Sequence, residues 1–294
     1  MLDFREPRIT DRAWIAPLTF ALRRENCEYC FGNIFCWSPV YRTYITRFGD
    51  FFLAVGLNDG MYCFPMGQGD LHRAIDALRD DAASRGWQLR MYGVSADDRA
   101  QLEAVCPGQF DFIEDRSFFD YIYLRADLAA LPGKRYHAKR NHIASLERAG
   151  GCTYEPITPD NMAQCMAMAE QWARQNADKD PAVLLGEQTA LRRAFDHYEA
   201  LELRGAALRR DGEVIAFTVG EALSDVMFVT HFEKAYADIR GAYPAINRDF
   251  AARELDDFTF INREEDTGDE GLRKAKLSYH PAKLLVKYEA VLRS

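Results

Sequence analysis

The 294-residue chain contains no hydrophobic run that approaches the roughly 20 residues of a membrane-spanning helix. Residues 1–6 lack the basic stretch and following apolar core of a secretory leader. Hydrophobic residues make up 48% of the chain and charged residues 28%, which is the composition of an ordinary folded protein. We therefore predict a folded protein of the cytoplasm without a transmembrane segment.

Cysteines are few and show no pairing pattern. The chain has seven, an odd number, scattered at Cys27, Cys30, Cys36, Cys63, Cys106, Cys152 and Cys165. A chain of this size needs no disulfide framework, and we predict none. Cys27 and Cys30 form a CxxC, but no second Cys or His pair follows at zinc-ligand spacing, and aromatic residues alternate with the cysteines as in a core. This pattern favours buried thiols over a metal site.

Positive charge is also in short supply, since the net charge is -8. Such a balance excludes a protein that coats nucleic acid nonspecifically. One local exception is residues 134–142, which carry Lys134, Arg135, Lys139 and Arg140 with two histidines and no acid. An isolated basic helix is often only a solvated face. In an acidic protein it is also where an anionic ligand would be drawn.

Apolar periodicity and turn residues predict the order of the secondary-structure elements. In the first part we expect three strands, a helix, a strand, a helix and a strand, at 43–48, 51–57, 61–64, 71–85, 88–94, 97–105 and 118–124. After residues 131–133 we expect a helix, a strand, two helices and a three-stranded meander, at 135–149, 152–157, 159–176, 187–201, 203–209, 214–221 and 226–233. A helix, a strand, a helix and a strand follow at 245–255, 258–262, 269–279 and 284–292.

The order in the second part is similar to the fold of the Gcn5-related N-acetyltransferases, and the first part resembles a reduced copy of it. We therefore predict an α+β protein of two tandem acyltransferase-like domains, residues 1–131 and 132–294, with the site in the second. A single larger α+β domain is the alternative.

In that fold the strands at 226–233 and 258–262 separate, and the acyl donor enters between them. Alternation along the first strand places His231 and Glu233 on one face. The second strand runs into Asn262, followed by three carboxylates at Glu264, Glu265 and Asp266. A carboxylate beside another carboxylate can act as a general base, whereas a salt-bridged one stays ionised and orients its neighbours. The sequence does not say which acid has which role.

Residues 262–281 contain the most specific motif of the chain, Asn-Arg-Glu-Glu-Asp-x-Gly-x-x-Gly-Leu-Arg-Lys-Ala-Lys-x-Ser-Tyr-x-Pro. It resembles the signature of a bacterial family grouped with the cytosolic C-terminal domain of phosphatidylglycerol lysyltransferases. Two earlier blocks are similar to the same family, at residues 28–37 and 133–142. The resemblance spans nearly the whole chain.

The resemblance implies a tandem acyltransferase fold and an aminoacyl group that moves from a charged tRNA to an acceptor. It also implies that Arg273 and Lys276, which share a helix face, are substrate contacts. The chain lacks the transmembrane portion of the lysyltransferases, and its acidic balance disfavours a lipid acceptor at an anionic membrane. The acceptor class stays open among a lipid, a peptide and a small molecule.

The loop at 238–245 bears on the donor. Acetyl-CoA enzymes hold the pyrophosphate with Gln/Arg-x-x-Gly-x-Gly/Ala at a helix start. Here Gly241 fills the glycine position, but Asp238 and Tyr243 stand where a basic or amide residue and a small residue belong. We therefore expect no bound cofactor, and an aminoacyl-tRNA as donor rather than acetyl-CoA. The helix with Lys139, Arg140 and Asn141 would then anchor the tRNA acceptor stem through its phosphates.

These expectations give each candidate residue a role. His231, Glu264, Glu265 or Asp266 would deprotonate the acceptor, Asn262 and Tyr279 would support the oxyanion, and Arg273 and Lys276 would hold the tRNA end. Two alternatives remain open, a coenzyme A-dependent N-acyltransferase and a noncatalytic protein that binds an anionic ligand.

Overall fold

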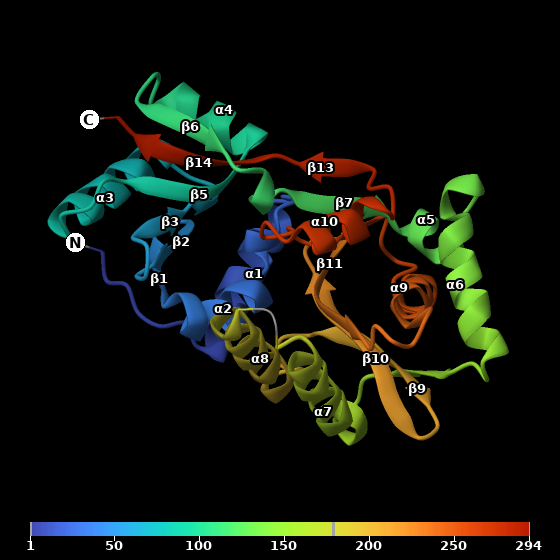
Figure 1. Cartoon of the computed structure of the whole chain (residues 1–294). Coiled ribbons are helices and arrows are strands. Elements are labelled where there is room, and N and C mark those ends of the chain that lie inside the picture. The colour runs from blue at the N-terminus through green and yellow to red at the C-terminus, as the bar shows by residue number, and fades with distance from the viewer. Residues whose placement is uncertain (1, 178–179, 294) are drawn as a thin grey trace. The chain divides into compact units, whose positions relative to one another are not determined.

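The structure of the chain is a computed structural model that describes residues 2–177 and 180–293. It contains mixed sheets flanked by helices, which confirms the predicted α+β class (Figure 1). Across the described residues, no helix combines the length and apolar character that crossing a membrane requires. The seven cysteines are all free, and six of them are buried, as the sequence predicted.

The chain forms two compact units. Unit 1 comprises residues 1–121, 264–276 and 283–294, and unit 2 comprises 122–263 and 277–282. This division differs from the predicted boundary between residues 131 and 132. Two C-terminal segments return to unit 1, and the second of them contains a strand that pairs with two strands from the first part of the chain.

Unit 1 is built on a mixed sheet in the order β1, β2, β3, β5, β14, β6, with β4 paired to β2. Its strands are β1 (Thr43–Phe48), β2 (Phe51–Gly56), β3 (Met61–Cys63), β4 (Met66–Gly67), β5 (Arg90–Ser95), β6 (Phe110–Glu114) and β14 (Lys287–Leu292). β3 and β5 are parallel. The C-terminal β14 pairs antiparallel with both β5 and β6 and so lies between them (Figure 1).

The helices of unit 1 are α1 (Arg12–Ala21), α2 (Phe31–Tyr41), α3 (Leu71–Ser84) and α4 (Ala96–Val105). The side chain of Asp70 accepts a hydrogen bond from the Arg73 amide and thereby begins α3. One face of α3 buries Ile75 and Leu78 against sheet residues such as Leu53. The predicted periodicity of this helix is confirmed.

Unit 2 is built on a second mixed sheet, in which β7, β12, β11, β10, β9 and β8 are neighbours in that order. Its strands are β7 (Asp120–Leu124), β8 (Thr153–Pro156), β9 (Arg204–Arg210), β10 (Glu213–Ala222), β11 (Met227–Ala235) and β12 (Phe260–Asn262). β9, β10 and β11 form the predicted meander. The unit boundary falls within β7, whose residues 122–124 pair with β12.

Helices cover both faces of this sheet. They are α5 (Arg125–Ala130), α6 (His137–Arg148), α7 (Pro159–Gln175), α8 (Pro181–Asp196) and α9 (Ala242–Arg253). Phe195 of α8 packs on Phe217 of β10, whereas Phe250 of α9 packs on Phe228 of β11, a residue of the opposite face. The remaining elements are α10 (Glu270–Leu277), β13 (Lys283–Leu285) and four short 3-10 turns at Ile9–Asp11, Cys27–Tyr29, Arg116–Phe118 and Lys134–Tyr136.

Some elements were not predicted. Helices α1 and α2 each contain a proline, at Pro17 and Pro39, which removes the usual sequence signal for a helix. Strand β6 was also not predicted. Most of its residues are exposed, so apolar and polar residues alternate little along it. The predicted strand at 284–292 is divided into β13 and β14.

Candidate functional site

In unit 2, strands β11 and β12 run parallel for only three residue pairs, from Met227 and Phe260 to Val229 and Asn262. Beyond this point β11 continues to Ala235, while β12 ends. The predicted separation of the two strands is therefore present. Asn262 is fully buried at the point where the two strands begin to separate. It pairs with Val229 of β11 on one side and with Ile122 of β7 on the other.

A β-bulge in β11 overturns the predicted common face of His231 and Glu233. Phe232 pairs with Val219 and Thr230 with Gly220, so His231 is the additional residue that the bulge inserts into β11. Such an insertion interrupts the alternation of side chains. His231 faces Glu221, whereas Glu233, which pairs with Thr218, lies on the opposite face beside α9. The period-two rule was wrong here because a bulge adds one residue to one strand only.

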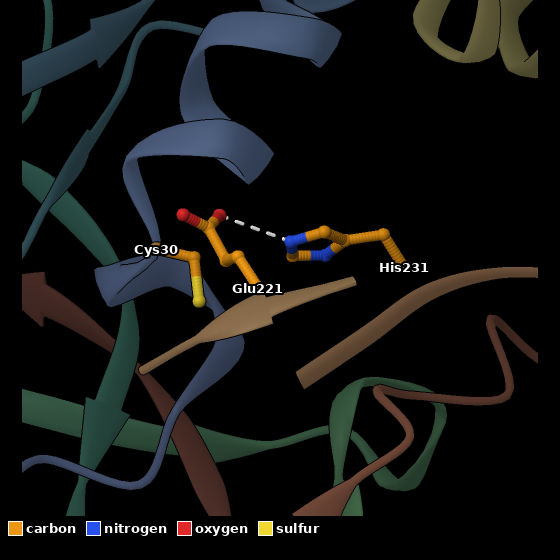
Figure 2. Close-up of side chains that lie close together, drawn as sticks. All are labelled: Cys30, Glu221 and His231. Atoms are coloured by element: carbon orange, nitrogen blue, oxygen red, sulfur yellow. Dashed lines mark hydrogen bonds and ion pairs between the residues drawn. The ribbon is translucent and has the colours of Figure 1, made fainter. Parts of the chain in front are cut away.

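His231 and Glu221 form a buried hydrogen-bonded pair (Figure 2). Nε2 of His231 lies 3.0 Å from Oε1 of Glu221, and their side chains are 4% and 7% exposed. A carboxylate in this position orients the imidazole and stabilises its protonated form. The sequence singled out His231 but missed Glu221, which only strand pairing brings near.

On the other face, Glu233 binds Arg263 and Asn247. Arg263 Nη2 donates to Glu233 Oε1 at 2.8 Å, and Asn247 Nδ2 donates to Oε2 at 3.2 Å. Arg263 is the residue after β12, so this ion pair spans the place where β11 and β12 separate. Its guanidinium also lies 4.8 Å from the ring centre of Tyr279.

Lys139 of α6 completes this group, with Nζ 3.8 Å from the same Tyr279 ring. Burial and then the neighbouring charge of Arg263 lower the pKa of Lys139 to about 8, while Glu233 opposes the shift. The sequence-predicted residues Lys139 and Tyr279 are thus brought together. Two cations and one carboxylate leave this group, which we call the unit 2 cluster (Lys139, Glu233, Asn247, Arg263, Tyr279), with an excess of positive charge.

Arg140 and Asn141 do not join the unit 2 cluster. Arg140 Nη1 donates to the carbonyls of Leu131 and Gly133, which follow the end of α5, and so stabilises that turn. Asn141 Nδ2 lies 3.0 Å from His137 on its own helix. Of the three predicted anchor residues on α6, Lys139 alone contacts Tyr279.

Gly241 at the start of α9 has a packing role. Its φ is +99°, and a Cβ there would lie 2.2 Å from the carbonyl oxygen of His142 in α6. Only glycine accepts both the conformation and the close approach. The glycine in this loop is therefore required for α9 to pack against α6, whether or not a phosphate binds there.

In unit 1, the three consecutive acids after β12 have separate surroundings. Glu264 adopts a left-handed backbone with φ of +56°, and its side chain accepts a hydrogen bond from Asn33 at 3.1 Å. The buried Lys276 donates to the carbonyls of Glu264 and Glu265, at 3.2 and 2.5 Å. Lys276 was expected to bind substrate, but its ammonium holds this turn together.

Asp266 and Arg273 bind each other. Both carboxylate oxygens of the fully buried Asp266 accept from Arg273, at 2.9 Å each, and Tyr121 and the Gly268 amide donate as well. Burial acts to raise the pKa of Asp266, but the bonds from Arg273 and Tyr121 lower it to about 2. Asp266 thus stays ionised and orients the loop. This ion pair disfavours the predicted roles of Asp266 as a base and Arg273 as a substrate contact.

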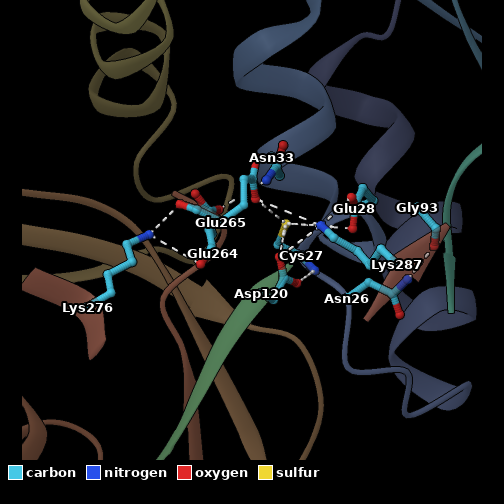
Figure 3. Close-up of polar contacts among 10 residues, drawn as sticks. All are labelled: Asn26, Cys27, Glu28, Asn33, Gly93, Asp120, Glu264, Glu265, Lys276 and Lys287. Atoms are coloured by element: carbon cyan, nitrogen blue, oxygen red, sulfur yellow. Dashed lines mark hydrogen bonds and ion pairs between the residues drawn. The ribbon is translucent and has the colours of Figure 1, made fainter. Parts of the chain in front are cut away.

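Glu265 faces a buried group that also contains Cys27, Glu28, Asp120 and Lys287, which we call the unit 1 cluster (Figure 3). Lys287 Nζ donates to Glu28 at 2.6 Å and to Asp120 at 2.8 Å, and lies 3.9 Å from Glu265. The Cys27 thiol lies 3.5 Å from both Asp120 and Glu265. One ammonium therefore faces three carboxylates.

Burial raises the pKa of Glu28 to about 7; the charge of Lys287 opposes this shift, while Asp120 and Glu265 add to it. Gly93 makes room for this carboxylate, since a Cβ there would lie 3.1 Å from Glu28 Cδ. The sequence placed Glu28 and Asn33 in one motif block without assigning them roles. Asp120 and Lys287 carried no sequence signal, because their partners are distant in the chain.

A family model for the C-terminal domain of phosphatidylglycerol lysyltransferase matches residues 19–291. The chain belongs to this family. The comparison with curated proteins finds no match. The family and the fold are those of a transferase, and the resemblance drawn from the motifs is confirmed.

Solved structures share the fold of this chain. A conserved protein of unknown function from Bacteroides thetaiotaomicron is 40% identical over 100% of both chains, with a TM-score of 0.94. The C-terminal domain assigned to a lysylphosphatidylglycerol synthetase of Agrobacterium fabrum has a TM-score of 0.71 at 17% identity, over 97% of this chain and 92% of that one. L-PGS from Bacillus licheniformis has a TM-score of 0.56 at 16% identity, over 86% and 81%. The last two show a shared fold.

Proposed function

We propose that the protein is an aminoacyltransferase that moves an aminoacyl group from a charged tRNA to a hydroxyl or amine acceptor. The observation that carries this proposal is the membership of nearly the whole chain in the phosphatidylglycerol lysyltransferase family. The acceptor is open among a lipid, a peptide and a small molecule.

Two features of unit 2 favour tRNA over coenzyme A as donor. The Arg263–Glu233 ion pair lies where β11 and β12 separate, which is where an acyl-CoA enzyme of this fold admits its donor. The loop before α9 carries Asp238, Tyr243 lies in the first turn of α9, and packing against α6 already explains Gly241. Arg240 is the basic residue of this loop that could bind a pyrophosphate.

The excess positive charge of the unit 2 cluster suits the donor. Lys139 presents a half-buried ammonium beside Tyr279, and the exposed Lys134 lies one helical turn before α6. Phosphates of an acceptor stem are drawn to such a surface, with an affinity that falls as salt rises. We propose that Tyr279 and Asn262 then donate to the oxyanion of the tetrahedral intermediate, as the sequence predicted.

Two proton acceptors of the predicted set carry this proposal, one in each unit. His231 is oriented by Glu221, and Glu265 lies in the unit 1 cluster. In the reaction, the acceptor nucleophile loses a proton to the base and forms a bond to the ester carbonyl carbon. The bond to the tRNA ribose oxygen then breaks, and that oxygen takes up a proton.

The test is transfer of a radiolabelled amino acid from mixed charged tRNA, with mass spectrometry of material that co-purifies with the protein. We expect His231→Ala or Glu265→Ala to lower the rate about 10²- to 10⁴-fold with intact folding. His72→Ala is the matched control, because His72 is an exposed histidine paired only with Asp76. If both active-site variants transfer at the wild-type rate, the assignment fails.

Lys276→Ala tests a different point, because Lys276 holds the turn at Glu264 and Glu265. We expect it to lower the rate by displacing Glu265. The coenzyme A alternative predicts that acetyl-CoA raises the melting temperature. A raised melting temperature with acetyl-CoA, and none with charged tRNA, would select that alternative. Binding of charged tRNA without transfer in any condition would select the noncatalytic one.

A further inference from the structure

The unit 1 cluster carries more negative than positive charge in a buried place. Lys287 is 2% exposed and Asp120 0%, while Glu28 and Glu265 are 17% and 25% exposed. Asp120 and Lys287 neutralise each other at 2.8 Å. Two further carboxylates then share the same ammonium. Like charges this close in a desolvated site disfavour a state in which both are ionised.

The Cys27 thiol links the two remaining carboxylates. Its sulfur lies 3.7 Å from Glu28 Oε2 and 3.5 Å from Glu265 Oε2. Burial and the neighbouring carboxylates raise the pKa of Cys27 well above its ordinary value, so the thiol keeps its proton. Cys27 can therefore donate a hydrogen bond to a carboxylate but does not act as a nucleophile.

The charged and titratable groups that face Glu28 come from every neighbouring element. Lys287 lies on β14, Asp120 on β7 and Glu265 after β12. Tyr29, Cys63 of β3 and Tyr92 of β5 lie near enough to feel its charge, and all three are protonated because burial raises their pKa. Lys287 supplies the cation at the centre.

The ammonium also occupies the position that a metal would take. Cys27, Glu28 and Asp120 place ligand atoms within 4.8 Å of one another. Lys287 Nζ lies 2.6 and 2.8 Å from the two carboxylates of that trio. The ammonium of Lys287 would repel a second cation at this position. We therefore interpret Cys27, Glu28 and Asp120 as the residues that bind Lys287.

We propose that Glu28 and Glu265 act beside Lys287 as a single proton-accepting pair that binds one proton between its two carboxylates, with Glu28 and Lys287 as positioning residues for Glu265. This rests on the proposed transfer. The pair starts fully ionised, and Glu265, the more exposed member, takes the proton that the acceptor nucleophile loses. The pair then holds one proton, which passes to the leaving ribose oxygen or to water, and no other reactant is needed. Such a pair titrates with values that belong to both carboxyls together.

The pH profile of transfer tests the pair. In the wild type we expect the rate to fall as the pH drops through the neutral range. Glu28→Gln keeps the shape of the side chain but removes one negative charge, so the ammonium of Lys287 then faces only the carboxylates of Asp120 and Glu265 within this cluster. We expect this limb to move to lower pH by about one unit or more. Glu25→Gln is the matched control, since Glu25 is a surface acid paired with Lys283. An unchanged limb in Glu28→Gln overturns the proposal.

Lys287→Met alone removes the cation of a buried cluster and can prevent folding. The double variant Glu28→Gln with Lys287→Met removes one charge of each sign, so the net charge of the cluster is unchanged. We expect its acid limb to lie at higher pH than that of Glu28→Gln alone, since Glu265 then lacks the cation. A purely structural role of Lys287 would lower the rate at every pH without moving the limb, and that result would overturn the positioning role.

A second measurement does not depend on transfer activity. Carbon-13 NMR of the glutamate carboxyls should show one titration near neutral pH in the wild type, which is lost in both Glu28→Gln and Glu265→Gln. If every glutamate carboxyl titrates in the ordinary range, the shared proton does not exist. If the neutral titration is present but no charged tRNA supports transfer, the pair stands and the proposed function fails.

Discussion

The two buried clusters are opposites in charge. In the unit 1 cluster one ammonium, Lys287, faces Glu28, Asp120 and Glu265. In the unit 2 cluster Lys139 and Arg263 share one carboxylate, Glu233. Burial raises the pKa of Glu28 to about 7, and Asp120 and Glu265 add to this shift. Burial and then the charge of Arg263 lower the pKa of Lys139 to about 8.

The comparison teaches that burial alone does not decide which group changes its charge. Burial disfavours every ion, and the neighbouring charges oppose or add to that effect. One ammonium, Lys287, lies within 2.8 Å of both Glu28 and Asp120, whereas Arg263 has the carboxylate of Glu233 at 2.8 Å. Near neutral pH a proton is therefore gained by Glu28 in one cluster and lost from Lys139 in the other.

The largest effect should come from removing the central cation of the unit 1 cluster. Lys287→Met leaves Asp120 and Glu28 buried without it, and we expect a loss of about 3–5 kcal/mol in the free energy of unfolding. Urea unfolding measures this loss. Lys283→Met, at an exposed ion pair, should cost less than about 1 kcal/mol. Equal losses in the two variants would contradict the central place of Lys287.

The corresponding change in the unit 2 cluster is Arg263→Met. It removes the cation that lowers the pKa of Lys139 and leaves Glu233 unpaired beside it. We expect the pKa of Lys139 to rise from about 8 toward its ordinary value, as measured by NMR of the lysine side chain. Arg192→Met, at an exposed pair with Glu170, is the control. A value that stays near 8 would show that burial alone sets it.

Stability should depend on pH in opposite ways in the two clusters. The pKa of Glu28 is raised above its ordinary 4.5, so the folded state binds more protons and stability falls as pH rises from about 4.5 to 7. The pKa of Lys139 is lowered from 10.5 to about 8, so stability rises with pH across that window.

The unfolding free energies of Glu28→Gln and Lys139→Gln, compared with wild type from pH 4 to 10.5, measure how much each residue contributes to the change of stability with pH. Relative to wild type, Glu28→Gln should gain stability across the acidic window, and Lys139→Gln should lose it across the alkaline one. If the unfolding free energy of a variant follows the same pH dependence as that of the wild type, the residue replaced in that variant does not contribute to the pH dependence of stability.

The smallest effect should come from Asn141, which only contacts His137 on the same helix. Asn141→Ala should change stability by less than about 0.5 kcal/mol. Lys139→Gln should weaken binding of charged tRNA more than Asn141→Ala does, and filter binding at two salt concentrations measures the difference. Equal weakening would mean that α6 acts as a general basic surface and not through Lys139.

Local patterns were enough to predict much of the fold. The meander, the helices α3, α6 and α9, and the segment that follows β12 depend on periodicity and turn residues within a few positions. The candidate site was predicted in part. His231, Glu265, Lys139 and Tyr279 lie in buried or half-buried clusters, whereas Asp266, Arg273 and Lys276 serve the loop around the acids.

The sequence alone determined many of the helices and strands, which family the chain resembles and where its titratable residues are concentrated. Only the tertiary structure decided which of those residues meet. A bulge at His231 sent Glu233 to the other face, and β14 carried Lys287 to Glu28 and Asp120. Local propensity acts over a few residues, while pairing of strands and of buried charges joins residues whose separation in the chain leaves no local pattern.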